Sequence, residues 1–152
     1  RLHALARAHS LLIDAQWQSA ELKPLVEQAT DAYRVDHPRR IEVEGPPVTL
    51  SARKSLSLTL ILHELGTNAA KYGALSRHEG RLCITWTVER DSESECVRLI
   101  WQERDGPEVE SPQRRGFGSK LIDRAVESGL NGKAEIDYAR PGLACAITFP
   151  VP

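Results

Sequence analysis

Apolar residues recur at helical spacing in three parts of the chain. Over residues 1–15 they stand three or four positions apart, which is the spacing of one helix face. The segment 21–34 repeats the pattern behind Ser19, a residue type that caps helix N-termini. The longest helix is predicted over residues 51–72, where a capping serine begins it and Gly73 provides a suitable stop. Three helices are therefore expected in the first half of the chain.

Alternation of apolar and polar residues predicts the strands. Residues 40–45 alternate, and after a Gly-Pro-Pro turn residues 48–50 are predicted to form a short return strand. Two longer strands are predicted at about 81–90 and 96–103, followed by a helix at 119–129. A terminal hairpin of "KAEIDYA" and "LACAITF" closes the chain. This order of elements predicts an α/β sandwich with helices on one face of a sheet.

Length and composition fit one globular domain. The 152 residues are 41% hydrophobic and 27% charged. A net charge of −1 gives no support for a nucleic-acid partner or a membrane-surface role. No apolar run reaches the roughly 20 residues that would span a bilayer, so no membrane partner is expected for this segment. Because the chain has no Met and begins at Arg1, we expect it to be a fragment with more protein upstream.

The cysteines bear on the cellular compartment. They are odd in number and lack a C-x-x-C spacing, which argues against a disulfide framework and against a zinc site. We predict that Cys83, Cys96 and Cys145 are reduced thiols in strands. Reduced thiols favour a cytoplasmic location for the protein.

The stretch "HELGTNAAKYG", at residues 63–73, places polar groups on an otherwise apolar helix. At about 100° per residue, Glu64, Asn68 and Lys71 fall within roughly 60° of one another. One interpretation is the wet face of an amphipathic helix. The alternative is a metal-phosphate site, because an amide oxygen suits Mg²⁺ and an ammonium attracts phosphate. In that alternative, Glu64 would orient or deprotonate a nucleophile.

Two further segments carry candidate chemistry. In "RRGFGSKL", at residues 114–121, two glycines and a serine precede a helix, which allows close approach to phosphate oxygens, although a plain turn also fits. In "WQERDGP", at residues 101–107, carboxylates end an apolar strand and could accept a hydrogen bond from a ring amine such as that of adenine. The loop at 104–118 is long for a simple connection, so we predict a functional or mobile segment.

Together and in this order, the three segments resemble the ATP-binding boxes of the GHKL superfamily, specifically of the HWE-type sensor histidine kinases. "HELGTNAAKYGALS" is similar to the N box of that family, and His63 matches the histidine that gives the family the H of its name. Trp101 and Glu103 match the W-x-E signature, and "RRGFGSKLI" is similar to the second glycine box. "RLHALARAHSLL" resembles the second helix of the dimerisation domain that precedes the catalytic domain.

The resemblance implies a fold and a division of the chain. The fold would be an α/β (α+β) two-layer sandwich of the Bergerat type, with a mixed sheet of about five strands under three helices. Residues 19–152 would form the catalytic ATP-binding domain. Residues 1–18 would be the last helix of the dimerisation and histidine-phosphotransfer region, through which the protein would form a homodimer.

The resemblance also implies roles for site residues, with ATP and Mg²⁺ as cofactors. Asn68 would chelate Mg²⁺, Lys71 would contact phosphate, and Glu64 would assist the transfer as the catalytic residue. Glu103 would receive the adenine amine. The remaining ATP-binding positions implied by the boxes are His63, Tyr72, Asp105, Gly106, Arg115, Gly116, Phe117, Gly118 and Ser119.

One position departs from the family pattern. The family has two glycines before the proline that follows its glutamate, and Asp105 occupies the first of these places. Asp105 is therefore a rival of Glu103 for the adenine contact.

The implied activity is transfer of the ATP γ-phosphate to a histidine. The histidine would then pass it to an aspartate of a response-regulator receiver domain. The phosphoacceptor histidine and a sensory domain are expected upstream, outside this chain. Two alternatives remain open from the residues alone: a GHKL-type serine kinase of the anti-sigma class, and a degenerate adaptor domain that does not bind ATP. His63 and the W-x-E argue against the first, and Asn68 with Lys71 against the second.

Overall fold

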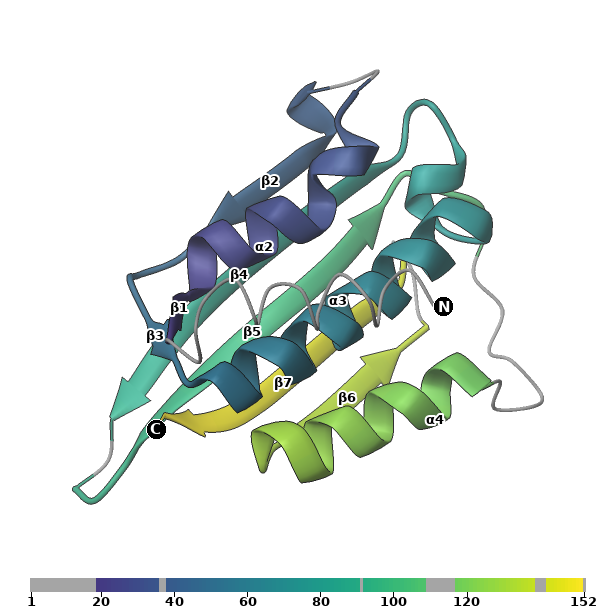
Figure 1. The fold of residues 1–152 in the computed structure, drawn as a ribbon. Coiled ribbons are helices and arrows are strands. Elements are labelled where there is room, and N and C mark those ends of the chain that lie inside the picture. Colours follow the sequence, from purple (N-terminus) through teal and green to yellow (C-terminus); the bar gives the residue numbers. More distant parts are fainter. Residues whose placement is uncertain (1–18, 36–37, 91, 109–116, 139–141, 152) are drawn as a thin grey trace.

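The computed structural model describes residues 19–35, 38–90, 92–108, 117–138 and 142–151. Three helices lie together on one face of a five-stranded sheet (Figure 1). The predicted two-layer α/β sandwich is therefore confirmed. The helix predicted over residues 1–15 lies outside the described residues.

The sheet is mixed, as predicted. Its strand order is β2-β4-β5-β7-β6, with β2 parallel to β4 and the other neighbours antiparallel. Strand β4 has the predicted bounds, β5 extends one residue beyond its predicted segment at each end, and the C-terminal hairpin forms as expected. The strand bounds are β2 (Ile41–Glu44), β4 (Arg81–Arg90), β5 (Glu95–Arg104), β6 (Lys133–Asp137) and β7 (Ala144–Val151).

A strand forms within the predicted segment 48–50, but the prediction that it returns along residues 40–45 is wrong. Strand β3 (Thr49–Leu50) pairs with β1 (Ala20–Glu21) in a separate two-stranded sheet, not with β2. The reason lies in the Gly-Pro-Pro turn. A Cβ on Gly45 would lie 2.2 Å from the Trp86 ring, and the Trp86 indole N–H donates to the Pro46 carbonyl oxygen at 2.7 Å. This contact holds the turn against Trp86 of β4, so the chain does not fold back along β2. The two prolines also lack the N–H donor that a hairpin needs.

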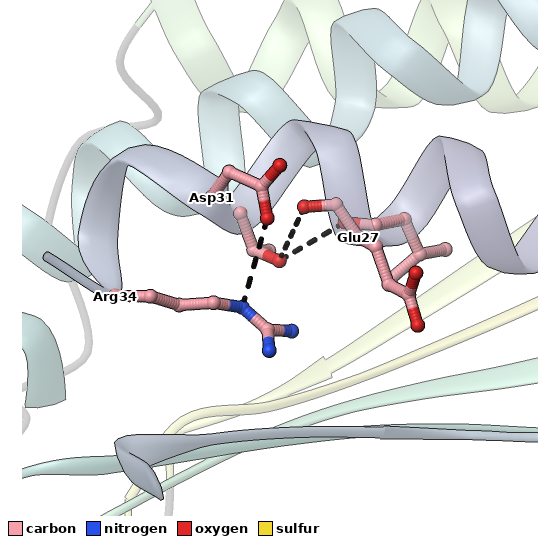
Figure 2. Close-up of polar contacts among 5 residues, drawn as sticks. Glu27, Asp31 and Arg34 are labelled. Atoms are coloured by element: carbon pink, nitrogen blue, oxygen red, sulfur yellow. Dashed lines mark hydrogen bonds and ion pairs between the residues drawn. The ribbon is translucent and has the colours of Figure 1, made fainter. Parts of the chain in front are cut away.

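Helix α2 (Leu22–Thr30) continues into a 3-10 turn at Asp31–Tyr33, close to the predicted segment 21–34. The predicted capping role of Ser19 is wrong, because the N-cap position is Glu21, whose side chain makes no capping hydrogen bond. Residues of β1 stand between Ser19 and the helix, so the helix begins only after the strand pair. Figure 2 shows its C-terminal end, where the Arg34 Nε lies 4.0 Å from the Asp31 carboxylate.

Helix α3 (Ala52–Lys71) is capped by Ser51, as predicted, since its hydroxyl oxygen accepts from the Lys54 N–H at 3.3 Å. One side of α3 packs on the sheet and forms the middle of the core. Inward side chains of alternate strand residues meet it, whereas the outward positions of β4 and β5 are exposed or half-buried. Among the most buried core residues are Leu22, Leu58, Ile61, Leu62, Ile84, Leu99, Trp101, Ile147 and Phe149.

Helix α4 (Phe117–Arg124) runs on into a π-helical turn at Ala125–Gly129. It begins two residues before the predicted start at residue 119. The helix ends at Asn131, which has a positive φ of 54°. Asparagine is one of the few residue types that tolerate this left-handed conformation.

The cysteines lie in strands and are free, as predicted. Cys83 is in β4, Cys96 in β5 and Cys145 in β7. Burial raises the pKa of the Cys145 thiol to about 12, so this thiol stays protonated at neutral pH.

Candidate functional site

The polar stripe predicted on α3 lies on the side of the helix that faces α4. We call Glu64, Asn68 and Lys71 the polar flank. Ser57 falls on the same line at helical spacing, and a Cβ on Gly129 would lie only 1.8 Å from the Ser57 hydroxyl oxygen. The C-terminal turn of the α4 segment therefore packs against this side of α3, as the neighbouring helices in Figure 1 also show. The wet-face interpretation fits the exposed Lys71 but not the buried Glu64.

Exposure increases along the polar flank toward the end of the helix. Glu64 is only 6% exposed, Asn68 is half-buried and Lys71 is exposed. Within the described ranges, neither the Asn68 amide nor the Lys71 ammonium bonds to another side chain or carbonyl. The Asn68 carbonyl oxygen of the backbone accepts from the Tyr72 N–H at 2.8 Å and from the Gly73 N–H at 3.2 Å. The backbone thus closes the helix while the polar side chains stay available.

Glu103 lies at the end of β5, on the face covered by the helices. Alternation places Trp101 and Glu103 on that same face, and both are buried, as predicted. One carboxylate oxygen of Glu103 accepts from the Ala74 N–H at 2.9 Å, and the other accepts from the Trp101 indole N–H at 2.9 Å. We call Ala74, Trp101 and Glu103 the helix-end cluster, because it joins the strand to the chain just after α3.

The helix-end cluster depends on close backbone packing. A Cβ on Gly73 would lie 2.1 Å from a Glu103 carboxylate oxygen, and a Cβ on Gly106 would lie 2.5 Å from the Ala74 Cα. Both positions therefore need glycine for space. The Glu103 N–H also donates to the Leu143 carbonyl oxygen at 2.9 Å, which ties the same strand end to the terminal hairpin.

The protonation of Glu103 reflects two opposing effects. Burial raises the pKa of its carboxyl, because the charged form loses water, and Glu103 is only 3% exposed. The hydrogen bonds from Ala74 and Trp101 lower this pKa and oppose the rise. The desolvation effect is the larger of the two.

Asp105 takes a different position from Glu103. It is exposed and has a positive φ of 57°, a conformation that favours glycine. This explains the departure from the family pattern in physical terms, since aspartate is one of the few side chains that tolerate this backbone. The prediction that Glu103 is buried and Asp105 solvent-facing is confirmed.

The remaining predicted site residues are divided among several places. His63 is half-buried on α3, off the line of the polar flank, and Tyr72 is 74% exposed at the end of that helix. Arg115 and Gly116 lie outside the described residues, as does most of the predicted mobile loop. Phe117, Gly118 and Ser119 form the first turn of α4 instead of preceding it.

Sequence reasoning missed one member of the helix-end cluster. The partner of Glu103 is the backbone N–H of Ala74, and a backbone donor leaves no mark in residue type. The signal that was available is the glycine at position 73, which leaves space for the carboxylate.

Two further properties of the described residues bear on the site. No helix in these segments combines the length and the apolar character that a bilayer crossing requires. The same residues hold no group of three or more His, Cys, Asp or Glu side chains that would ligate a metal.

The fold is that of the ATP-binding catalytic domains of histidine kinases. The ATP-binding domain of PrrB from Mycobacterium tuberculosis has a TM-score of 0.63 at 17% identity, over 89% of this chain and 97% of that one. The blue-light-activated histidine kinase of Erythrobacter litoralis has a TM-score of 0.67 at 16% identity, over 98% of this chain and 53% of that one.

The sequence is also similar to that of histidine kinases. Residues 1–47 match the model described as HWE histidine kinase. The chain is 35% identical over 151 residues to the blue-light-activated histidine kinase of Brucella ovis, covering 99% of this chain and 31% of that protein. It is 38% identical over 152 residues to the one from Brucella anthropi, with the same coverage. The resemblance to the HWE-type sensor histidine kinases is therefore confirmed, and the chain spans about a third of the length of these relatives.

Proposed function

We propose that this chain is the ATP-binding catalytic part of a sensor histidine kinase. It would bind Mg-ATP and direct the γ-phosphate to a histidine that lies outside the catalytic domain, from which a response-regulator receiver domain takes it. The observation that carries the proposal is the polar flank, where three side chains of different chemistry line the α4 side of α3. Histidine kinases with the same fold and related sequences support this choice over a serine kinase or an adaptor.

The phosphate end of the nucleotide would lie along the polar flank. Asn68 offers a hard amide oxygen to Mg²⁺, and its side chain has no bond to another described residue. Lys71, which is exposed, would contact the phosphates as a point charge. Bound Mg²⁺ would supply charge neutralisation on the phosphates. Glu64, buried beside them, would orient or deprotonate the incoming histidine.

The first turn of α4 would cover the phosphates. Its backbone N–H groups belong to Phe117, Gly118 and Ser119, and the start of a helix favours anions. Arg115 and Gly116 would complete this lid. We expect the loop to order when nucleotide binds.

The adenine end would lie against the helix-end cluster. Each oxygen of Glu103 already accepts one hydrogen bond, and a carboxylate oxygen has a second lone pair for the adenine amine. The hydrogen bonds from Ala74 and Trp101 would hold that carboxylate in one orientation. Tyr72 and Gly106 stand on either side of the same turn as candidates for contacts to the nucleotide.

Further partners follow from this proposal. A homodimer through residues 1–18, an upstream sensory domain and a cytoplasmic location all belong to it. Residues 19–152 would then form the catalytic domain, with the first segment serving the dimerisation and phosphotransfer region.

The test is calorimetric titration of the chain with Mg-ATP. We expect an affinity between about 1 μM and 1 mM, which corresponds to roughly −8 to −4 kcal/mol. Chelating Mg²⁺ should weaken binding, and GTP should bind poorly because its ring carries a carbonyl where adenine has the amine. Absence of Mg-ATP binding would overturn the kinase proposal in favour of the adaptor alternative.

A further inference from the structure

A cavity of about 440 Å³ opens at the edge of the sheet where β2 and β4 begin. Strands β2 and β4 are parallel, with Ile41 opposite Leu82, so the turns that precede them come together. The first turn is the 3-10 segment Pro38–Arg40, and the second ends at Gly80. Residues 38–40 and 78–81, some forty positions apart in sequence, thus line the same cavity.

The walls of this cavity are mainly basic. Arg39, Arg40 and Arg81 line it together with His78, against one carboxylate, that of Glu79. In the described part of the chain, neither Arg39 nor Arg81 forms an ion pair. The whole chain has a net charge of −1, so this concentration of arginines is a local feature and not a consequence of composition.

A neighbouring pair adds to the positive charge. Arg81 stands directly opposite Arg104 in the β4–β5 ladder, and both side chains are exposed. Like charges directly opposite each other in a sheet are unfavourable. This repulsion would fall if an anion bound near Arg81.

Arg40 gives the cavity a fixed wall. Its Nη2 donates to the Arg77 carbonyl oxygen at 2.9 Å and lies 3.5 Å from the Ala74 carbonyl oxygen. Its Nε is buried and has no hydrogen-bond partner among the described residues. Because backbone carbonyls hold its Nη2, the Arg40 guanidinium has a fixed position in the wall, which favours pairing with an anion.

We propose that this cavity binds a small oxyanion with two or more negative charges, either a phosphate compound or a polycarboxylate. The volume is that of a small-ligand site, and guanidinium groups pair with both chemistries through parallel N–H donors. The site differs from the polar flank, because none of Glu64, Asn68 and Lys71 lines the cavity. The proposal does not depend on the kinase function.

The test titrates the chain with citrate and with tripolyphosphate at constant ionic strength, followed by calorimetry and by amide chemical shifts. The double variant Arg39→Gln/Arg81→Gln removes two cationic walls. The control Arg98→Gln/Lys133→Gln removes the same charge from exposed positions elsewhere on the sheet. We expect the cavity variant to lose about tenfold or more in affinity for the probe and the control to change by less than about twofold.

The two probes distinguish the chemistry, since the one that binds more tightly identifies a phosphate or a carboxylate ligand. Asn68→Ala should leave probe binding unchanged, and the shifts should be largest at residues 38–40 and 78–81. Three results would overturn the proposal: no binding of either probe, equal losses in both double variants, or loss of probe binding in Asn68→Ala, which would place the anion in the nucleotide site. Mg-ATP binding by the cavity variant should stay unchanged.

Discussion

The helix-end cluster and the polar flank belong to neighbouring stretches of one chain, yet they are built in opposite ways. In the cluster, both oxygens of the buried Glu103 accept hydrogen bonds at 2.9 Å from the protein itself. On the flank, Asn68 and Lys71 make no side-chain bond to another described residue, and Lys71 is exposed.

The difference separates two uses of polar groups. A buried group that is bonded internally contributes to stability, and losing its partner leaves donors unpaired. A group that is left open contributes little to folding and remains free for a ligand. Substitutions should therefore divide cleanly: the cluster should affect the free energy of unfolding, and the flank should affect nucleotide binding.

The largest effect is expected for Glu103→Ala. It leaves the Ala74 N–H and the Trp101 indole N–H buried without an acceptor, and each unpaired donor costs about 1–3 kcal/mol. We expect the free energy of unfolding in urea to fall by about 3 kcal/mol or more. Lys71→Ala, the matched change on the flank, should change it by less than about 0.5 kcal/mol. Similar losses in the two variants would remove the distinction between the regions.

The converse effect is expected for Asn68→Ala. This variant removes the proposed Mg²⁺ ligand but no hydrogen bond to a described side chain, so stability should hold within about 0.5 kcal/mol. Affinity for Mg-ATP should fall by about tenfold, equivalent to 1.4 kcal/mol, and chelation of Mg²⁺ should then have less effect than in the unsubstituted chain. Unchanged ATP affinity in Asn68→Ala would sink the assignment of the flank to the phosphates.

These regions also differ in how far sequence could predict them. The flank was visible because it depends on spacing along one helix, which periodicity reports directly. The same local logic located β4 and β5 to within about one residue, because alternate positions of a half-buried strand differ in polarity. The burial of Glu103 and the exposure of Asp105 followed from their places at the strand end and in the turn.

What sequence could not supply were contacts between distant segments. The bond from the Ala74 N–H to Glu103 spans 29 positions and uses a backbone donor, and the Trp86 bond that redirects the chain at Pro46 spans 40. Because of the Trp86 bond, Thr49 and Leu50 pair with β1 and not with β2. Such contacts depend on which elements lie side by side in the sheet, and no local pattern encodes that.

A smaller effect, on pH dependence, tests the protonation of Glu103. Burial raises its pKa above the ordinary 4.5, so the folded state binds the proton more tightly than the unfolded state. The resulting contribution to stability is fully present below the unfolded pKa and is lost as pH rises through the folded value. The free energy of unfolding of the unsubstituted chain, relative to Glu103→Gln, should therefore fall as pH rises above 4.5. Urea titrations across this range check it, and a difference that is flat or rises with pH would contradict it.

The smallest expected effect concerns Asp105, which is exposed and stands beside the cluster without being part of it. Its φ of 57° suits glycine best. For most residues with a Cβ, this conformation costs roughly 1–2 kcal/mol of stability, and for aspartate it costs less. Asp105→Gly should stay within about 0.5 kcal/mol of the unsubstituted chain, because relief of strain is offset by the greater freedom of glycine when unfolded. Asp105→Ala should be less stable than Asp105→Gly by about 1 kcal/mol.

The same position decides which carboxylate reads adenine. Asp105→Asn should leave Mg-ATP affinity nearly unchanged, because its side chain faces solvent. Glu103→Gln should lower that affinity by about 1–3 kcal/mol, the range for a hydrogen bond to a charged group, since it keeps the size of the side chain and only one acceptor oxygen. Calorimetry on both variants, at a temperature where each is folded, makes the comparison. If Asp105→Asn abolished binding and Glu103→Gln did not, the adenine contact would lie two residues further along the chain, in the turn, and the helix-end cluster would serve the fold alone.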